Sequence, residues 1–206
     1  MELFKKHLET IAPLNIEEWK LAKDLFKEEK ISKGEYFVQL DEVCTKLAFV
    51  SKGLFRMFYI VNGEENTTLF FSENQFVTDY FSFLTQTPSI GPIQAIENSI
   101  VYSVSYTDLQ KLYEFKNWER IGRIMSERAF SFSVMEANRF LHDDYDTRYV
   151  TFIKENPDYI QRISQYMIAS YLKMTPETLS RVKKRISKKN EREFKSIFET
   201  PKSKFL

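Results

Sequence analysis

The sequence predicts an α+β protein with three parts: an antiparallel β-roll of the double-stranded β-helix or jelly-roll type, a long helix, and a C-terminal helix-turn-helix of the winged kind. Three observations lead to this prediction. Short strand-like segments follow Ser32, glycine and proline nearly vanish from Asp108 to His142, and a capped basic helix directly follows a short apolar one within residues 166–185. We place the three parts at residues 1–115, 116–143 and 144–206.

The composition indicates a folded protein with enough residues for one large or two small hydrophobic cores. The chain has 206 residues, a formal net charge of +1 and 43% hydrophobic residues, whereas disordered chains combine low hydrophobicity with high net charge. The single cysteine, Cys44, excludes an intrachain disulfide framework, a CxxC metal pair and an iron–sulfur cluster held by several thiolates. We therefore expect no metal site.

The sequence shows no membrane or secretion signal. No run approaches the roughly 20 apolar residues that a membrane helix needs, and the N-terminal MELFKKHLETIAPLN lacks a continuous apolar signal core. We expect a cytoplasmic protein without a membrane partner.

Charge is distributed unevenly along the chain. Residues 1–146 hold 16 Lys and Arg against 23 Asp and Glu, a net of −7, whereas residues 147–206 hold 14 against 6, a net of +8. An acidic body with a basic end favours a polyanionic partner for that end alone. A solvated basic tail is the alternative.

Residues 3–30 are predicted to be helical. Apolar residues recur there at three- and four-residue spacing, with a break near Pro13. After Ser32 the pattern changes to short segments rich in β-branched and aromatic residues, among them GEYFVQL, LAFVSKG, LFRMFYIV, TTLFFSE, PIQAIE and SIVYSVSY. Asn62-Gly63 is a strong hairpin signal. Six to eight short strands at this spacing predict a compact antiparallel roll or sandwich.

A long helix is predicted to follow the roll. Its apolar seam has steps of three, four, seven and three residues and consists of Trp118, Ile121, Met125, Phe132 and Met135. We expect the far end of this helix to pair with its copy in a homodimer. Packing on its own domain is the alternative. Asp144 or Asp146 can then cap the next helix, which Pro157 ends.

The segment from Ile163 onward predicts a two-helix unit. Ala169 is small enough for a close helix crossing, and apolar residues continue around the turn and along the second helix: Ile168, Leu172, Met174, Leu179 and Val182. Thr175-Pro176-Glu177 begins the second helix, because a threonine hydroxyl caps free amides, proline at the first helical position loses no hydrogen bond, and glutamate favours the positive end of the helix.

The outward positions of that second helix form a polar and cationic face that fits the major groove of DNA. They are Pro176, Glu177, Ser180, Arg181, Lys184 and Lys188. Arg181 can bind guanine O6 and N7, and Glu177 can accept from cytosine N4. Hydroxyls placed for phosphate oxygens belong to Ser164, Thr175 and Thr178, and Gln165 and Arg185 complete the predicted DNA-binding set. An ordinary surface helical hairpin with solvated charges is the alternative.

At these residues the chain resembles the Crp/Fnr family of bacterial transcription regulators. ISQYMIASYL followed later by PETLSR is similar to the helix-turn-helix of that family, and KGLFRMFYIVNGEENTTLFF with NQFVTDYFSF is similar to its cyclic-nucleotide-binding-type roll. The resemblance implies a sensor roll, a dimerisation helix, double-stranded DNA and RNA polymerase as partners, and base reading by Glu177 and Arg181. Two positions depart from the pattern. Pro176 stands where cyclic-AMP-responsive members read a base with arginine, and Lys173 replaces the usual glycine of the turn.

The resemblance also locates a region where cyclic-nucleotide sensors bind a phosphate with glycine-glutamate and arginine-serine pairs. Here these pairs become Thr78-Asp79 and a position near Ser89, and no arginine lies between Arg56 and Arg120. A phosphate loses its strongest partner without a guanidinium, so we expect no cyclic AMP or cyclic GMP and predict no cofactor.

The many aromatic residues of the roll are expected to form its core. The alternative is an apolar pocket for an unidentified small-molecule effector, bordered by Ser133 and Val134 of the long helix. Haem ligation through His7 or His142 is a weaker alternative.

Three classes of function remain for this sequence. The first is a dimeric DNA-binding regulator. The second is a sensor or scaffold whose C-terminal helices bind a protein partner. An enzyme has little support, because the sequence contains no Gly-rich phosphate loop, GxSxG, HExxH or dense cluster of histidines and carboxylates. We predict a protein that is not an enzyme.

Overall fold

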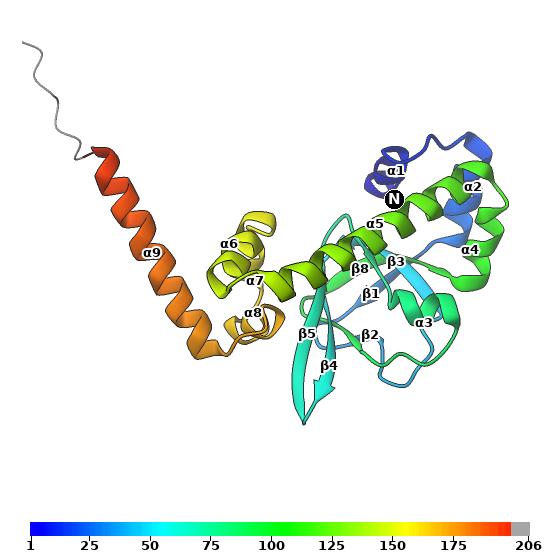
Figure 1. Cartoon of the computed structure of the whole chain (residues 1–206). Helices are drawn as coiled ribbons and strands as arrows, with labels where there is room; N and C mark the ends of the chain where they lie inside the picture. Colours follow the sequence, from blue (N-terminus) through cyan, green and yellow to red (C-terminus); the bar gives the residue numbers. More distant parts are fainter. Residues whose placement is uncertain (199–206) are drawn as a thin grey trace, which may run out of the picture. The chain divides into compact units, whose positions relative to one another are not determined.

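The computed structural model describes the backbone of residues 1–198 and side chains through Lys188. The chain forms two compact units that divide after Val134, and Figure 1 shows their elements along the sequence. Within residues 1–198, no helix combines the length and the apolar character needed to cross a bilayer.

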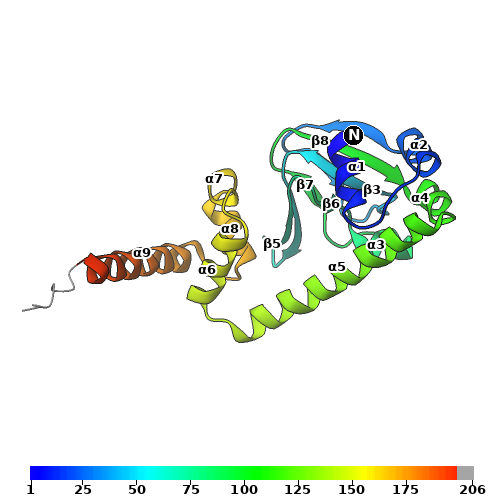
Figure 2. The ribbon, with the colours of Figure 1, turned by 90° about the horizontal axis from the view of Figure 1, so that it is seen from above.

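Two short helices begin the first unit, α1 (Glu2–Glu9) and α2 (Ile16–Leu25). The side chain of Asn15 accepts the Glu18 amide proton at 2.9 Å and the Glu18 carboxylate accepts that of Asn15 at 2.8 Å, which is a capping box. The helix α1 lies against β3 (Lys46–Lys52) (Figure 2), because its apolar face buries Phe4 and Leu8 completely.

The predicted helix through residue 30 is wrong at its end, since Lys27–Ile31 forms strand β1. This strand pairs antiparallel with β8 (Ser99–Ser105), from Lys27 opposite Ser103 to Ile31 opposite Ser99. Lysine and glutamate favour helices in isolation, but ladder hydrogen bonds to β8 and a hydrogen bond that the Lys46 ammonium donates to the Glu29 carboxylate outweigh that preference here. Charged residues also suit an edge strand, which β1 is.

Two four-stranded antiparallel sheets form the roll, with strand orders β1-β8-β3-β6 and β2-β7-β4-β5. The remaining strands are β2 (Tyr36–Val38), β4 (Phe55–Val61), β5 (Glu64–Phe71), β6 (Phe76–Val77) and β7 (Ile93–Ala95). The predicted hairpin is confirmed, because Val61 pairs with Glu64 across Asn62 and Gly63. Both turn residues have positive φ, 53° and 81°, as a type I′ turn requires.

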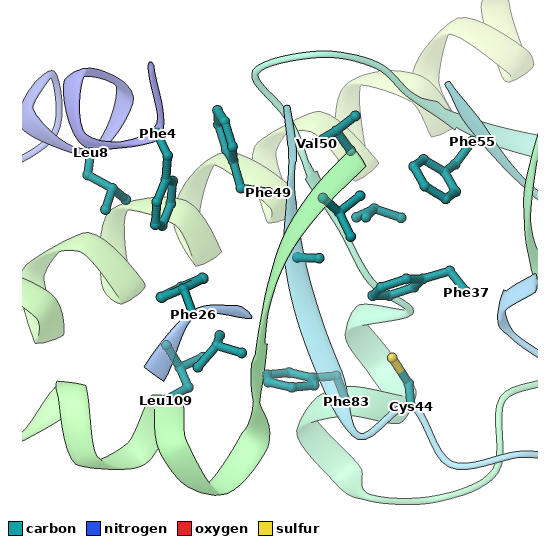
Figure 3. Close-up of a cluster of buried hydrophobic side chains, with 14 of the residues drawn as sticks. Phe4, Leu8, Phe26, Phe37, Cys44, Phe49, Val50, Phe55, Phe83 and Leu109 are labelled. Carbon is teal, nitrogen blue, oxygen red and sulfur yellow. The ribbon is translucent and has the colours of Figure 1, made fainter. Parts of the chain in front are cut away.

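The roll and its helices share one hydrophobic core, part of which Figure 3 shows. Phe4 packs against Phe26 and Phe49 with ring centroids 4.6 and 5.0 Å apart. Cys44 is 1% exposed, and its thiol lies 3.2 Å from the Thr78 hydroxyl. The aromatic residues of the roll that are fully buried, Phe49, Phe55, Phe58 and Phe83, are therefore packing residues.

Two helices follow the roll, α4 (Tyr106–Tyr113) and the predicted long helix α5 (Lys116–His142). The first turns of α5 pack into the core of their own unit, with Trp118 2% and Ile121 4% exposed. Its register beside α3 (Tyr80–Thr85) is fixed by a 2.5 Å hydrogen bond between the hydroxyls of Tyr80 and Ser126.

The second unit holds the end of α5 and four further helices: α6 (Tyr145–Glu155), α7 (Tyr159–Arg162), α8 (Gln165–Tyr171) and α9 (Pro176–Phe198). Asp144 caps α6 as predicted, since its carboxylate accepts the Thr147 amide proton at 2.8 Å. Residues 187–198 continue α9 rather than forming strands of a wing. Residues 199–206, the rest of the tail, lie outside the described residues.

Candidate nucleic-acid interface

Helices α8 and α9 meet at a short turn whose geometry is that of a glycine-type helix end. Ser164 caps α8 by accepting the Met167 amide proton at 3.3 Å. At the other end of α8, Met174 donates to the Ala169 carbonyl at 3.0 Å and Lys173 donates to the Ser170 carbonyl at 3.1 Å. These two bonds define a Schellman motif. Lys173 accordingly has φ +57°, the left-handed conformation for which glycine is usual.

The start of α9 is capped by Thr175. Its hydroxyl accepts the Thr178 amide proton at 3.2 Å, and Pro176 occupies the first helical position. The carboxyl of Glu177 has a pKa below its usual value, chiefly because its own backbone amide and then the Thr175 hydroxyl bond to it. Glu177 is therefore ionised and projects from the exposed start of the helix.

The inner side of the two-helix unit is apolar and closely packed. Ala169 is fully buried at the crossing, and the other residues predicted to face inward are 1–9% exposed: Ile168, Leu172, Met174, Leu179 and Val182. This burial fixes the rotation of α9. It leaves a single outer face that presents Pro176, Glu177, Ser180, Arg181, Lys184 and Lys188 to solvent.

The predicted DNA-binding residues differ in how free their polar groups are. Arg181 is exposed, and one guanidinium nitrogen lies 3.2 Å from the Thr178 hydroxyl. Gln165 accepts from the ammonium of Lys183 at 2.8 Å. Arg185, by contrast, forms an ion pair with Asp146 of α6. This pair was not predicted from the sequence, because no local pattern around Asp146 links it to Arg185, which lies 39 positions later in the chain.

A second polar cluster attaches the end of α5 to α6 and α8 within the C-terminal unit. Arg139 donates to Glu136 at 2.8 Å and also pairs with Glu155. The Tyr171 hydroxyl donates to Glu136 at 2.7 Å. Burial, followed by the carboxylate of Glu136, raises the pKa of Tyr171. Arg148 completes the attachment with a 2.8 Å bond to the carbonyl of Phe140. No sequence pattern predicted this cluster, which holds α8, the first helix of the two-helix unit, in place.

In the roll, Thr78, Asp79 and Ser89 lie together and are buried. Asp79 caps α3 by accepting from the Ser82 amide at 3.2 Å, and it accepts the Ser89 hydroxyl proton at 2.6 Å. Ser89 also lies 2.9 Å from the Gly91 carbonyl. Asp79 and Ser89 therefore satisfy one another, whereas the Thr78 hydroxyl donates to the Lys46 carbonyl at 3.3 Å. The remaining predicted pocket residue, Ser133 on α5, is exposed and bonds to the Phe130 carbonyl of its own helix.

The five residues of the predicted pairing seam divide into two groups. Trp118 and Ile121 are buried in their own unit, and Met125 is half-buried against the same core, so they offer little surface to a second chain. Phe132 and Met135 are each 42% exposed. The far half of α5 exposes further apolar side chains that the predicted seam did not include: Phe130, Val134 and Leu141.

The imidazole of His7 packs against the rings of Phe49 and Phe76, with centroid distances of 5.3 and 5.9 Å. Burial, followed by the charge of Arg128, lowers the pKa of its imidazole. Among the described residues, no three histidine, cysteine, aspartate or glutamate side chains lie close enough together to hold a metal ion.

Comparisons with known proteins agree with this architecture. Residues 28–115 match the family model of the cyclic nucleotide-binding domain. FixK2 from Bradyrhizobium japonicum is similar in structure, with a TM-score of 0.70 and 18% identity over 81% of this chain and 86% of FixK2. No curated protein matches the chain in sequence.

Two further structures extend the likeness. A protein from Eubacterium rectale described as a transcriptional regulator of the Crp/Fnr family has a TM-score of 0.66 and 18% identity, over 85% of both chains. The c-di-GMP-responsive global regulator CLP of Xanthomonas campestris has a TM-score of 0.66 and 15% identity, over 85% of this chain and 93% of CLP. This protein therefore carries a cyclic nucleotide-binding-type domain over residues 28–115, in a chain that has the fold of the Crp/Fnr regulators.

Proposed function

We propose that this chain is a dimeric, sequence-specific DNA-binding transcription regulator of the Crp/Fnr type, active in the cytoplasm with RNA polymerase as a partner. The observation that carries the proposal is the exposed start of α9. There a capped helix presents Glu177, Ser180 and Arg181 on one face, while the opposite face is fully buried. A helix held in this way can insert its first turns into the major groove.

The chemistry of this face fits direct reading of base pairs. The Arg181 guanidinium can donate two parallel hydrogen bonds to guanine, and the ionised Glu177 can accept from cytosine. The proton of the Thr178 hydroxyl is available for a phosphate oxygen, because that hydroxyl accepts from Arg181 and Thr175. Because Pro176 offers no polar side chain, we expect base reading to depend on Glu177 and Arg181.

The roll is proposed not to bind cyclic AMP. The buried carboxylate of Asp79 already holds the Ser89 hydroxyl, so a phosphate at this position would meet a negative charge and no free donor from Ser89. No arginine lies between Arg56 and Arg120 to compensate. Thermal unfolding with and without cyclic AMP tests this proposal. We expect no shift in the unfolding temperature, and stabilisation by a saturating nucleotide would contradict it.

Dimerisation is proposed through the far half of α5. Large apolar side chains are exposed there on more than one side of the helix, and contact with a second copy would remove them from water. Two recognition helices would then meet two half-sites of one operator.

A protein-binding role for α8 and α9 is the competing function. The exposed Tyr166, 51% accessible at the start of α8, is the observation that favours it. Salt discriminates the two: phosphate contacts make affinity fall steeply with ionic strength, and an apolar protein groove does not respond in this way.

Selection of bound fragments from random-sequence DNA, at low and at physiological salt, tests the proposed function. We expect a palindrome with half-sites about 10 base pairs apart. The Arg181→Ala variant, carried through the same selection, should lose preference at one position of each half-site. Absence of any enriched sequence from both salt conditions would contradict the proposal.

A further inference from the structure

Arg185 of α9 and Asp146 of α6 form an ion pair with two contacts. The Nε of Arg185 donates to one carboxylate oxygen at 2.7 Å and the Nη2 donates to the other. This parallel arrangement is the strongest form of arginine–carboxylate contact and fixes both side chains in orientation. The Arg185 side chain nevertheless remains 59% exposed.

The pair lies on the flank of the proposed DNA-binding face. Arg185 follows Arg181 by four residues, so it lies about one helical turn further along nearly the same side of α9. Lys184 beside it is exposed on the outer face. Asp146 belongs to the first turn of α6, where the positive end of the helix stabilises a carboxylate.

The same guanidinium nitrogens that bind a carboxylate would bind a phosphate. An arginine on this flank, within a turn of Arg181, would otherwise be a natural contact to the DNA backbone. Asp146 occupies the edge of the guanidinium formed by Nε and Nη2, so a phosphate could bind through that edge only if the carboxylate were displaced and left with its negative charge facing the DNA. A phosphate at the remaining Nη1 edge would lie beside the same negative charge.

We propose that Asp146 limits the sequence-independent affinity of α9 for DNA by holding Arg185 away from the phosphates, so that Arg185 acts as a positioning residue between α9 and α6. This inference rests on the proposed DNA-binding function and deepens it. The proposal assigns different roles to the cations of α9. Arg181 and Lys184 face the nucleic acid, and Arg185 stabilises the packing of α9 against α6.

The slope of log affinity against log salt concentration tests the proposal, because each phosphate contact adds about 0.9 to its magnitude. Asp146→Asn removes the charge that holds Arg185. We expect this variant to steepen the slope on random-sequence duplex by about 0.9 per protomer, which corresponds to about a 3.5-fold greater loss of affinity per protomer between 50 and 200 mM salt.

Asp144→Asn is the matched control. It removes one negative charge two residues away, which attracts Arg185 only through space while its hydrogen bond goes to the Thr147 amide. The substitution keeps a good capping residue and leaves the Asp146–Arg185 contact intact. Its slope should equal that of the wild type. The double variant Asp146→Asn with Arg185→Gln should return to the wild-type slope, because the released guanidinium is then absent.

Fluorescence anisotropy with full-length protein and a labelled duplex of random sequence gives all four slopes. An unchanged slope for Asp146→Asn, or an equal steepening for Asp144→Asn, would overturn the proposal. A wild type with no salt-dependent binding would refute the DNA-binding function itself. A double-mutant cycle of Asp146→Asn and Arg185→Gln, measured as free energy of unfolding in urea, reports the ion pair without DNA. A protein that forms the ion pair but does not bind DNA is therefore distinguishable from a protein that lacks the ion pair.

Discussion

Replacing Lys173 with glycine and with alanine measures the strain in the turn between α8 and α9. Lys173 has φ +57°, and its amide and that of Met174 close the end of α8. A residue with a β-carbon pays about 1–2 kcal/mol for this conformation, and glycine does not. Alanine keeps the β-carbon and glycine removes it.

Both variants lose the same side-chain interactions of Lys173. The ammonium of Lys173 lies 6.0 Å from the ring centroid of Phe140, and both substitutions abolish that contact. Glycine also gains about 0.4–1 kcal/mol of conformational freedom in the unfolded chain, which offsets part of its advantage. When this entropy term is subtracted from the relief of backbone strain, the glycine variant should be more stable than the alanine variant by about 0.5–1 kcal/mol.

Urea unfolding followed by far-ultraviolet circular dichroism measures this difference. With a dependence of about 1 kcal/mol per molar urea, the midpoint of the glycine variant should lie about 0.5–1 M above that of the alanine variant. Both tryptophans, Trp19 and Trp118, belong to the first unit, so their fluorescence transition should stay fixed and serves as the internal control. A glycine variant no more stable than the alanine variant would refute strain at this turn.

Three further predictions concern DNA reading, dimerisation and pH. Arg181→Ala should cost about 1–3 kcal/mol of affinity on the selected operator and less on random DNA, both measured by anisotropy; equal losses on both would exclude base reading. Phe132→Glu and Phe130→Glu place a charge on two sides of the far half of α5, and sedimentation should show monomers for the side that pairs. If both variants stay dimeric, the pairing does not use this part of the helix. Because the pKa of His7 is lowered in the folded state, the unfolded chain binds a proton first as pH falls below about 6.5, and stability drops as pH passes through the folded pKa. His7→Gln should remove this drop between pH 7.5 and 5.5 in thermal unfolding, and an identical pH profile would contradict it.

Local signals in the sequence predicted much of the fold. Asn62-Gly63 allows positive φ at both positions, so it identified the β4–β5 hairpin without knowledge of the rest. Thr175-Pro176 likewise identified the start of α9, because capping depends on residues within one turn. The inward residues of α9 followed from helical spacing alone.

The errors arose where distant residues decide the outcome. Lys27–Ile31 is a strand because β8 supplies its hydrogen bonds, and its own residues favour a helix. The apolar spacing of α5 could not separate the turns that pack on the roll at Trp118 from those that remain exposed at Phe132. In the candidate interface, the sequence identified Arg185 as a cation near DNA, but its partner on α6 becomes visible only when two helices pack together.

The buried position of Cys44 makes this protein convenient for spectroscopic labelling. The thiol is 1% exposed and lies 3.3 Å from the Lys46 carbonyl, and burial raises its pKa. Maleimides react with exposed thiolates, so the native side chain should remain unmodified at neutral pH. A cysteine introduced at the exposed Ser131 of α5 would be the single reactive site of each chain, and a fluorophore or spin label there could follow assembly without any change to the native core.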